Sequence, residues 1–318
     1  MINAELENAD FISDFDGLKI SAVVSIPNET IRGIVQIVHG MNEHKERYFD
    51  FMDYLAGKGF LCAIHDNRGH GGSIKNPEDL GFMYRNGGEG FVEDIAQFNR
   101  IIRNMCVPTL PCFLIGHSMG SLGARCFLKK YDTYIDGIIV SGSPSYNRYS
   151  GIVSRFEASV LAGYSERYRC HKIAKISEKV FNRGLGDIPH SWICTQKDVV
   201  YKFNADPLCS FTYTLNGYRA VLYLIHETYN KNGGWEVKNP QLPIRFVSGA
   251  DDTVMVSERD FKKSVHFLRE RGYRNISYKL FDGMRHEILN EKNNQTVYMD
   301  IEKTLYSWIA EIDKKQKG

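Results

Sequence analysis

A chain of 318 residues is long enough to bury a sizeable core within one α/β domain. Its 40 basic and 38 acidic side chains leave a formal charge of +2, so we expect no nucleic acid as a partner. Uncharged apolar runs of about 18 residues are absent, and the first 16 residues lack a basic start followed by an apolar run, so we expect neither a stable membrane anchor nor a secretory signal.

The seven cysteines are scattered along the chain and include no C-x-x-C pair. That usage indicates neither a zinc site nor a redox motif. Reduced thiols in a cytoplasmic protein are the expected state.

The predicted elements begin with a β-hairpin, because Asp16-Gly17 separates two strand-like runs at residues 11–15 and 18–26. Further strand-like runs then alternate with stretches of helical periodicity. The runs lie at residues 33–39, 60–65, 112–116 and 135–141, and the helical stretches at 48–57, 90–105 and 118–130. Such alternation predicts βαβ units and a mostly parallel sheet.

This rhythm stops near Ser143 and resumes after Asn232. The second part has predicted strands at 244–248 and 276–281 and predicted helices at 257–271 and 296–312. We therefore predict an α/β core of residues 1–144 and 236–318, interrupted by an insertion over residues 145–235. The insertion is enriched in aromatic residues, which would either line an acyl pocket or build its own small core.

The candidate nucleophile is Ser118, within Gly116-His117-Ser118-Met119-Gly120. This G-x-S-x-G sequence follows a predicted strand and opens a predicted helix, a context that forces a sharp turn and exposes the serine hydroxyl. The alternative is a serine that only caps the helix N-terminus. The strand before the motif and the helix after it favour the nucleophile.

Acyl transfer also needs two donors for the developing oxyanion. The N–H of Met119 is one candidate, and that of Met41, in the loop after residues 33–38, is the other. Gly40 beside Met41 allows close approach to a substrate. His39 and His44 in this loop would be a weak metal pair, so we expect their imidazoles to orient the loop instead.

The candidate base is His286, which follows the predicted strand 276–281. Two acids compete to orient it, because Asp251 and Asp252 both follow the strand 244–248 at the carboxyl edge of the sheet. We favour Asp252, whose spacing from Gly249 is usual in related hydrolases. Asp282 is interpreted as a turn residue.

Five motifs carry a family resemblance: H-G-M-N-E-H, D-N-R-G-H-G-G-S, G-H-S-M-G, G-A-D-D-T-V and G-M-R-H-E-I-L-N-E. In this order they resemble the monoglyceride lipase and lysophospholipase branch of the α/β-hydrolases, also called the serine aminopeptidase S33 group. The resemblance covers residues 33–141 and 242–318, and extends weakly to Ser191-Trp192 and residues 205–209.

The resemblance implies an α/β-hydrolase fold: a mostly parallel sheet with an N-terminal antiparallel hairpin and a mainly helical cap at residues 145–235. It implies Ser118, Asp252 and His286 as catalytic triad, Met41 and Met119 as oxyanion donors, and no cofactor or metal. The implied activity is hydrolysis of a small acyl ester, a monoacylglycerol or lysophospholipid, through an acyl-enzyme. Transient contact with lipid aggregates is compatible with such a substrate.

Two alternatives keep the fold. One is a proline-type aminopeptidase with the same triad, for which Glu157, Glu166 and Glu178 of the insertion are available to capture a substrate amine. The other is a non-hydrolytic ligand-binding homologue. The presence of all the predicted triad and oxyanion residues argues against it.

Overall fold

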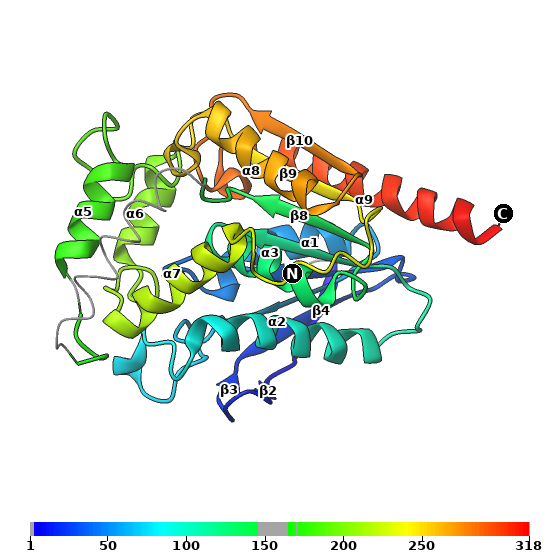
Figure 1. The fold of residues 1–318 in the computed structure, drawn as a ribbon, viewed down its shortest axis with the longest axis horizontal. Coiled ribbons are helices and arrows are strands. Elements are labelled where there is room, and N and C mark those ends of the chain that lie inside the picture. The colour runs from blue at the N-terminus through cyan, green and yellow to red at the C-terminus, as the bar shows by residue number, and fades with distance from the viewer. Residues whose placement is uncertain (1–2, 146–164, 170, 318) are drawn as a thin grey trace.

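The computed structural model describes residues 3–145, 165–169 and 171–317. Its centre is an eight-stranded sheet with helices on both faces (Figure 1). In spatial order the strands are β1 (Ala4–Asn8), β4 (Ala22–Pro27), β6 (Phe60–His65), β5 (Gly33–Val38), β7 (Cys112–His117), β8 (Gly137–Ser141), β9 (Ile244–Gly249) and β10 (Ile276–Phe281). β4 runs antiparallel to β1 and β6, and all pairs from β6 to β10 are parallel.

The N-terminal hairpin differs from its prediction. Asp16-Gly17 turns between β2 (Phe11–Ile12) and β3 (Lys19–Ile20), which form a separate two-stranded sheet. The predicted strand 18–26 is broken, and its second part is β4 of the main sheet. The sequence did not predict β1, because four of its five residues are exposed and show no apolar alternation.

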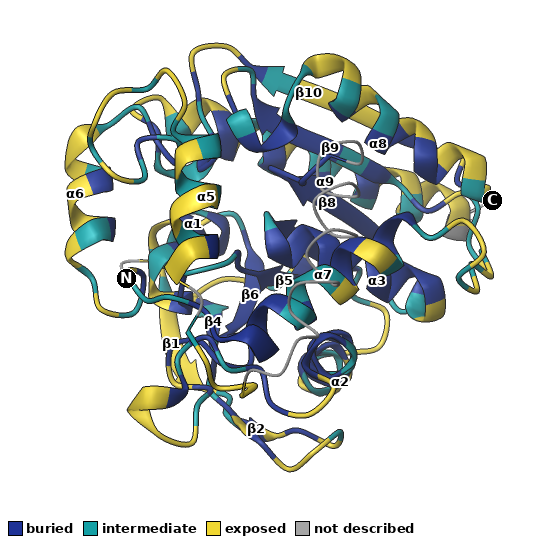
Figure 2. Ribbon diagram, turned by 60° about the vertical axis from the view of Figure 1, so that its left-hand side comes forward, coloured by how far each residue is buried: buried dark blue, intermediate teal, exposed yellow. Residues whose placement is uncertain are grey.

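The central strands separate two hydrophobic cores, since alternate side chains point to opposite faces. On β5, Val35 and Ile37 face α1 (Phe49–Ala56) and α9 (Asn294–Lys317). Val38 belongs to the other core, which includes residues of α2 (Gly87–Asn104), α3 (Met119–Tyr131) and α8 (Glu258–Arg271). Every residue of β5, β6 and β7 is buried, and Figure 2 shows β5 and β6 in the dark blue of buried residues. This burial explains their continuous apolar runs.

Most predicted boundaries differ from the observed ones by one to three residues. α2 begins three residues earlier than predicted. Its first two residues are glycines, and because glycine is a poor helix former, the sequence pattern did not indicate this first turn. Short 3₁₀ turns complete the core at Lys45–Tyr48, Pro77–Asp79, Thr253–Met255 and Ile288–Asn290.

Three described helices lie between β8 and β9 in the sequence: α5 (His171–Phe181), α6 (Lys197–Ala205) and α7 (Leu215–Tyr229). They gather at one end of the molecule (Figure 1), where α7 packs against α2 and α3. Residues near α6, Phe203 and Cys209 among them, form a small cluster of their own. Residues 146–164 lie outside the described part, so the limits of a cap at 145–235 stay a prediction.

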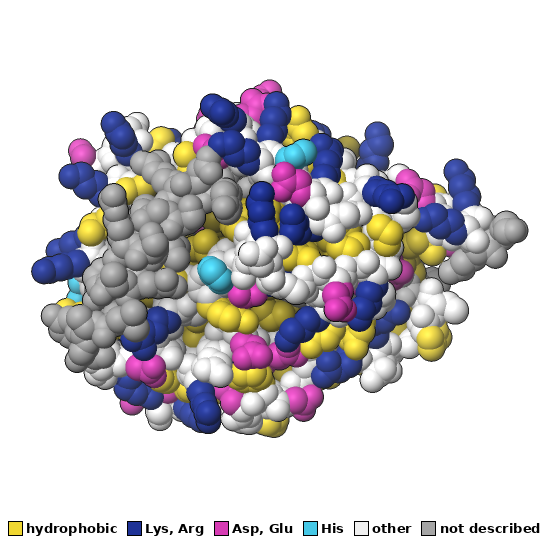
Figure 3. Space-filling model, viewed as in Figure 1, with side chains coloured by type: hydrophobic (Ala, Val, Ile, Leu, Met, Phe, Trp, Pro, Cys, Tyr) yellow, Lys and Arg dark blue, Asp and Glu magenta, His cyan; other side chains and the backbone are white. Residues whose placement is uncertain are grey.

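The surface carries both signs of charge. Figure 3 shows Lys and Arg side chains interspersed with Asp and Glu over the visible face. None of the helices in the described ranges has the length and apolarity needed to cross a bilayer.

Candidate active site

The turn between β7 and α3 holds Ser118 in a strained conformation, with φ 52° and ψ −119°. Its N–H donates to Ser141 O at 2.9 Å, which ties the turn to β8. The flanking glycines are required by close packing. A Cβ on Gly120 would lie 2.2 Å from Val38 O, and one on Gly116 would lie 2.6 Å from Gly120 O. The strand-turn-helix context predicted for G-x-S-x-G is therefore present.

A buried histidine and a buried aspartate meet beyond β9 and β10. His286 Nδ1 donates to Asp252 Oδ2 at 2.9 Å. Asp252 also accepts hydrogen bonds from Ser248 Oγ (2.9 Å) and from Val254 N–H (2.8 Å), which fix its carboxylate. Asp251 is exposed, and its N–H donates to a backbone carbonyl. The structure thus places Asp252, and not Asp251, against the imidazole.

Electrostatics favour a charged pair at this point. Burial by itself would lower the pKa of His286, but the charge and hydrogen bond of Asp252 raise it, and Glu287 and Glu43 add to this rise. Burial would raise the pKa of Asp252, but the charge of His286 lowers it. The neighbouring His117 is different, because burial and the charge of His286 lower its pKa to about 3. His286 can therefore carry a proton while His117 stays neutral.

Ser118 and His286 reach the same edge of the sheet through shared neighbours. The rings of His117 and His286 lie 4.6 Å apart, and a Cβ on Gly142 would lie 3.0 Å from both. A Cβ on Gly40 would lie 3.0 Å from Ser118 Cβ. His286 Nε2 is buried and has no hydrogen-bond partner in the part of the chain that the structure describes. The proton path from Ser118 to this nitrogen stays a prediction, since catalytic hydrogen bonds often form fully only with substrate.

The two predicted oxyanion donors border the serine. Met119 is the first residue of α3, where N–H groups have no intrahelical partner. Met41 follows Gly40, whose N–H donates to Glu43 Oε1 at 3.2 Å. Within the described ranges, the N–H groups of Met41 and Met119 donate no hydrogen bond. Their role as donors to a substrate stays a prediction.

His39 orients the loop that carries Met41. Its Nδ1 lies 2.8 Å from Gly40 O, and its Nε2 accepts a hydrogen bond from Asn67 N–H at 2.9 Å. Burial lowers the pKa of His39 well below its usual value, so the ring is neutral. Both ring nitrogens are engaged with the backbone, as a structural role requires.

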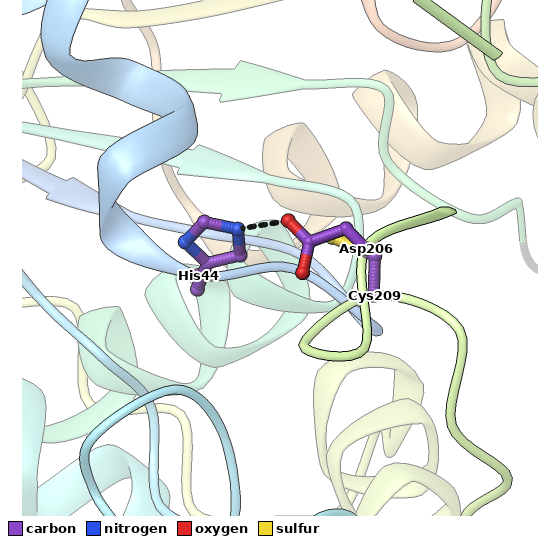
Figure 4. A group of neighbouring side chains, drawn as sticks. All are labelled: His44, Asp206 and Cys209. Atoms are coloured by element: carbon purple, nitrogen blue, oxygen red, sulfur yellow. Dashed lines mark hydrogen bonds and ion pairs between the residues drawn. The ribbon is translucent and has the colours of Figure 1, made fainter. Parts of the chain in front are cut away.

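Among the described residues, His44, Asp206 and Cys209 bring three potential metal ligands within 4.8 Å of one another (Figure 4). Both imidazole nitrogens already face carboxylates, Glu46 at 2.6 Å and Asp206 at 2.9 Å. Burial would lower the pKa of His44, but hydrogen bonds to Cys209, Glu46 and Asp206 raise it to about 10. A metal would have to displace that proton. The arrangement favours an ion pair that joins the loop to the segment after α6.

Sequence reasoning missed the side chain that packs against His286. The Trp192 ring packs against His286 at 5.2 Å between centroids. Its Nε1 donates to Glu178 Oε2 at 3.0 Å, which anchors it to α5. The sequence offered only a weak signal, the resemblance at Ser191-Trp192. Contact between these segments depends on tertiary packing.

Comparison with known proteins adds the family. The model of the family described as serine aminopeptidase, S33, matches residues 29–293. The chain belongs to this family. The predicted resemblance to its monoglyceride lipase-like branch is confirmed.

Two relatives align over nearly their whole length. A monoacylglycerol lipase of Mycolicibacterium smegmatis is 25% identical and covers 92% of this chain and 94% of its own. A monoglyceride lipase of Saccharomyces cerevisiae is 27% identical and covers 92% and 91%. Among solved structures, a carboxyl esterase of Bacillus coagulans in complex with glycerol superimposes with a TM-score of 0.84 at 25% identity, over 96% of this chain and 99% of its own. The predicted α/β-hydrolase fold is confirmed.

Proposed function

We propose that this chain hydrolyses monoacylglycerols and related lysolipid esters through an acyl-enzyme on Ser118. The enzyme class is a carboxylic ester hydrolase, in agreement with the lipase and esterase relatives. The observation that carries the proposal is the strained Ser118 turn at the sheet edge where Asp252 binds His286. A serine that only capped a helix would need neither the strain nor the buried pair.

The reaction follows from this geometry. His286 Nε2 takes the proton of Ser118 Oγ as the oxygen attacks the ester carbonyl. The N–H groups of Met41 and Met119 stabilise the tetrahedral oxyanion. Its collapse breaks the C–O bond, and the leaving alcohol takes the proton from His286. Water, deprotonated by the same imidazole, then attacks the acyl carbonyl; the bond to Ser118 Oγ breaks, the serine oxygen regains a proton from His286, and the carboxylic acid is released. Asp252 holds the ring tautomer and stabilises the imidazolium in both steps.

The choice of substrate rests on the relatives. The two described above are named for monoacylglycerol or monoglyceride, and a phospholipase of Bacillus subtilis is 23% identical over 83% of this chain. A small acyl ester is thus the partner proposed. The six described cysteines are free thiols, which agrees with a proposed cytoplasmic location.

The aminopeptidase alternative finds little support in the acids available to it. Glu178 already binds Trp192 Nε1 and the N–H of His190. Glu166 is paired with Arg219 at 3.1 Å. Glu157 lies outside the described residues. Capture of a substrate amine by Glu166 or Glu178 would require breaking these contacts.

A labelling and hydrolysis experiment tests the proposal. Wild type should react with a fluorophosphonate probe and hydrolyse monoacylglycerol in preference to proline naphthylamide. Ser118→Ala should lose both activities, and Ser121→Gly, which removes the other hydroxyl of the same turn, should keep the labelling. An unlabelled folded wild type would favour the non-hydrolytic alternative, and preference for the proline amide would favour the aminopeptidase.

A further inference from the structure

Three charged side chains meet beside the candidate site: Glu43 and Glu287, which are buried, and Arg47, which is largely buried. Arg47 Nη2 forms a short ion pair with Glu287 Oε2, and its Nε lies 3.8 Å from Glu43 Oε2. The side chains are 5%, 13% and 4% exposed, respectively. Buried ion pairs contribute little net stability, because desolvation opposes the Coulomb gain. Stability alone therefore gives no reason for this group.

The group joins two loops that are 240 residues apart in the sequence. Glu43 lies two residues after Met41, and its Oε1 accepts the N–H of Gly40 at 3.2 Å. Glu287 directly follows His286, and its Oε2 also accepts Asn290 Nδ2 at 2.8 Å. One end of the group therefore holds the predicted oxyanion loop and the other holds the predicted base.

Other contacts fix the Arg47 guanidinium in place. It lies 4.9 Å from the centroid of the Phe203 ring, and its Nη1 is 3.7 Å from Cys209 Sγ. The cavity beside Glu43, Arg47, His117 and Glu287 has a volume of about 10 Å³. That is room for about one water molecule. A substrate does not fit there, so these side chains act through the loops they hold.

We propose that Glu43, Arg47 and Glu287 are positioning residues: their charged contacts fix the distance between His286 and the predicted oxyanion loop, which carries Met41. The inference rests on the proposed function, because it concerns the geometry of that reaction. Arg47 is its centre, since its guanidinium binds Glu287 directly and lies 3.8 Å from the Glu43 carboxylate, and so faces both loops. Arginine suits this role because it stays charged when buried, and so attracts both carboxylates while its Nη2 binds Glu287.

Charge around the base supports the same assignment. Among the described residues, the charged groups that act on His286 or on the adjacent His117 ring include Asp252, Glu287, Glu43 and Arg47. After Asp252, the carboxylates of Glu287 and Glu43 raise the pKa of His286. Neutralising Glu287 should therefore shift the acid limb of kcat/KM to lower pH, because the base loses its proton more easily.

The test compares Arg47→Met with Arg245→Met. Arg245 forms an ion pair with Asp300 at the amino end of β9, with side chains 18% and 14% exposed, and so controls for loss of a partly buried cation away from the site. With p-nitrophenyl butyrate we expect Arg47→Met to lower kcat by about 10- to 100-fold with KM within about threefold, because small misplacements are costly in the transition state. Arg245→Met should change kcat by less than about twofold.

Two conservative variants keep the test valid if Arg47→Met folds poorly. Arg47→Lys retains the charge and should recover part of the lost kcat. Glu287→Gln retains shape and should move the acid limb downward. The positioning role is overturned if the Arg47 variants have the same kcat as Arg245→Met. It is also overturned if the acid limb of the kcat/KM pH profile is at the same pH in Glu287→Gln as in wild type. A folded wild type that neither hydrolyses esters nor is labelled overturns the proposed function and, with it, this inference.

Discussion

The assignment of Asp252 over Asp251 gives the most discriminating prediction. All three groups that face the Asp252 carboxylate are donors: His286 Nδ1–H, Ser248 Oγ–H and Val254 N–H. In Asp252→Asn the amide NH₂ must face one of these donors. If it faces the ring, the imidazole adopts the tautomer with its proton on Nε2, and this nitrogen can no longer accept the proton of the serine.

The expected magnitude follows from these contacts. Loss of a hydrogen bond to a charged partner costs about 1.5–3 kcal/mol. The wrong tautomer should add a comparable amount, so kcat should fall by about 10⁴-fold, or about 5.5 kcal/mol in activation free energy. The residual activity should also change its pH dependence. Because Asp252 raises the pKa of His286, its neutralisation lowers that pKa and shifts the acid limb to lower pH.

The assay is the pH dependence of kcat/KM for a soluble ester, measured on wild type, Asp252→Asn and Asp251→Asn. Asp251 is exposed, so Asp251→Asn is the matched control and should stay within about threefold of wild type. A loss in Asp251→Asn as large as in Asp252→Asn would refute the reasoning. So would an Asp252→Asn enzyme with more than about a tenth of wild-type kcat.

Two further predictions concern the loop around Gly40. Gly120→Ala should lower both the melting temperature and kcat. Its methyl group would lie 2.2 Å from Val38 O and would displace the strand that leads into this loop. An unchanged melting temperature in a thermal scan would contradict the close packing at Gly120. The ion pair of His44 with Asp206 predicts a pH-dependent stability. The folded-state pKa of His44 is about 10, above its usual 6.5, so the contribution is complete below pH 6.5 and is lost as pH rises through about 10. The difference in unfolding free energy between wild type and His44→Gln should therefore shrink from about pH 7 to about pH 10, as measured by urea titration, and a constant difference would exclude a charged pair.

Much of the architecture could be predicted from local patterns. The buried strands read as continuous apolar runs because both faces of the sheet are covered, and the G-x-S-x-G turn is fixed by glycines that neighbouring backbone atoms approach closely. The two features that the sequence did not predict also have physical reasons. β1 carries no apolar alternation because most of it is exposed, and α2 begins with glycines that hide its first turn. Pairing with β4 decided β1, and α2 packs against α3 and α7.

The sequence by itself determined the kinds of groups available and the edge of the sheet where each predicted catalytic residue would emerge, because parallel strands end together. The tertiary structure decided which groups meet. It placed Asp252 rather than Asp251 against His286, packed Trp192 over that ring, and buried Arg47 with Glu287. These contacts join segments far apart in the chain. Local propensity has no information about them, because their energies arise only when packing excludes water from charged and aromatic side chains.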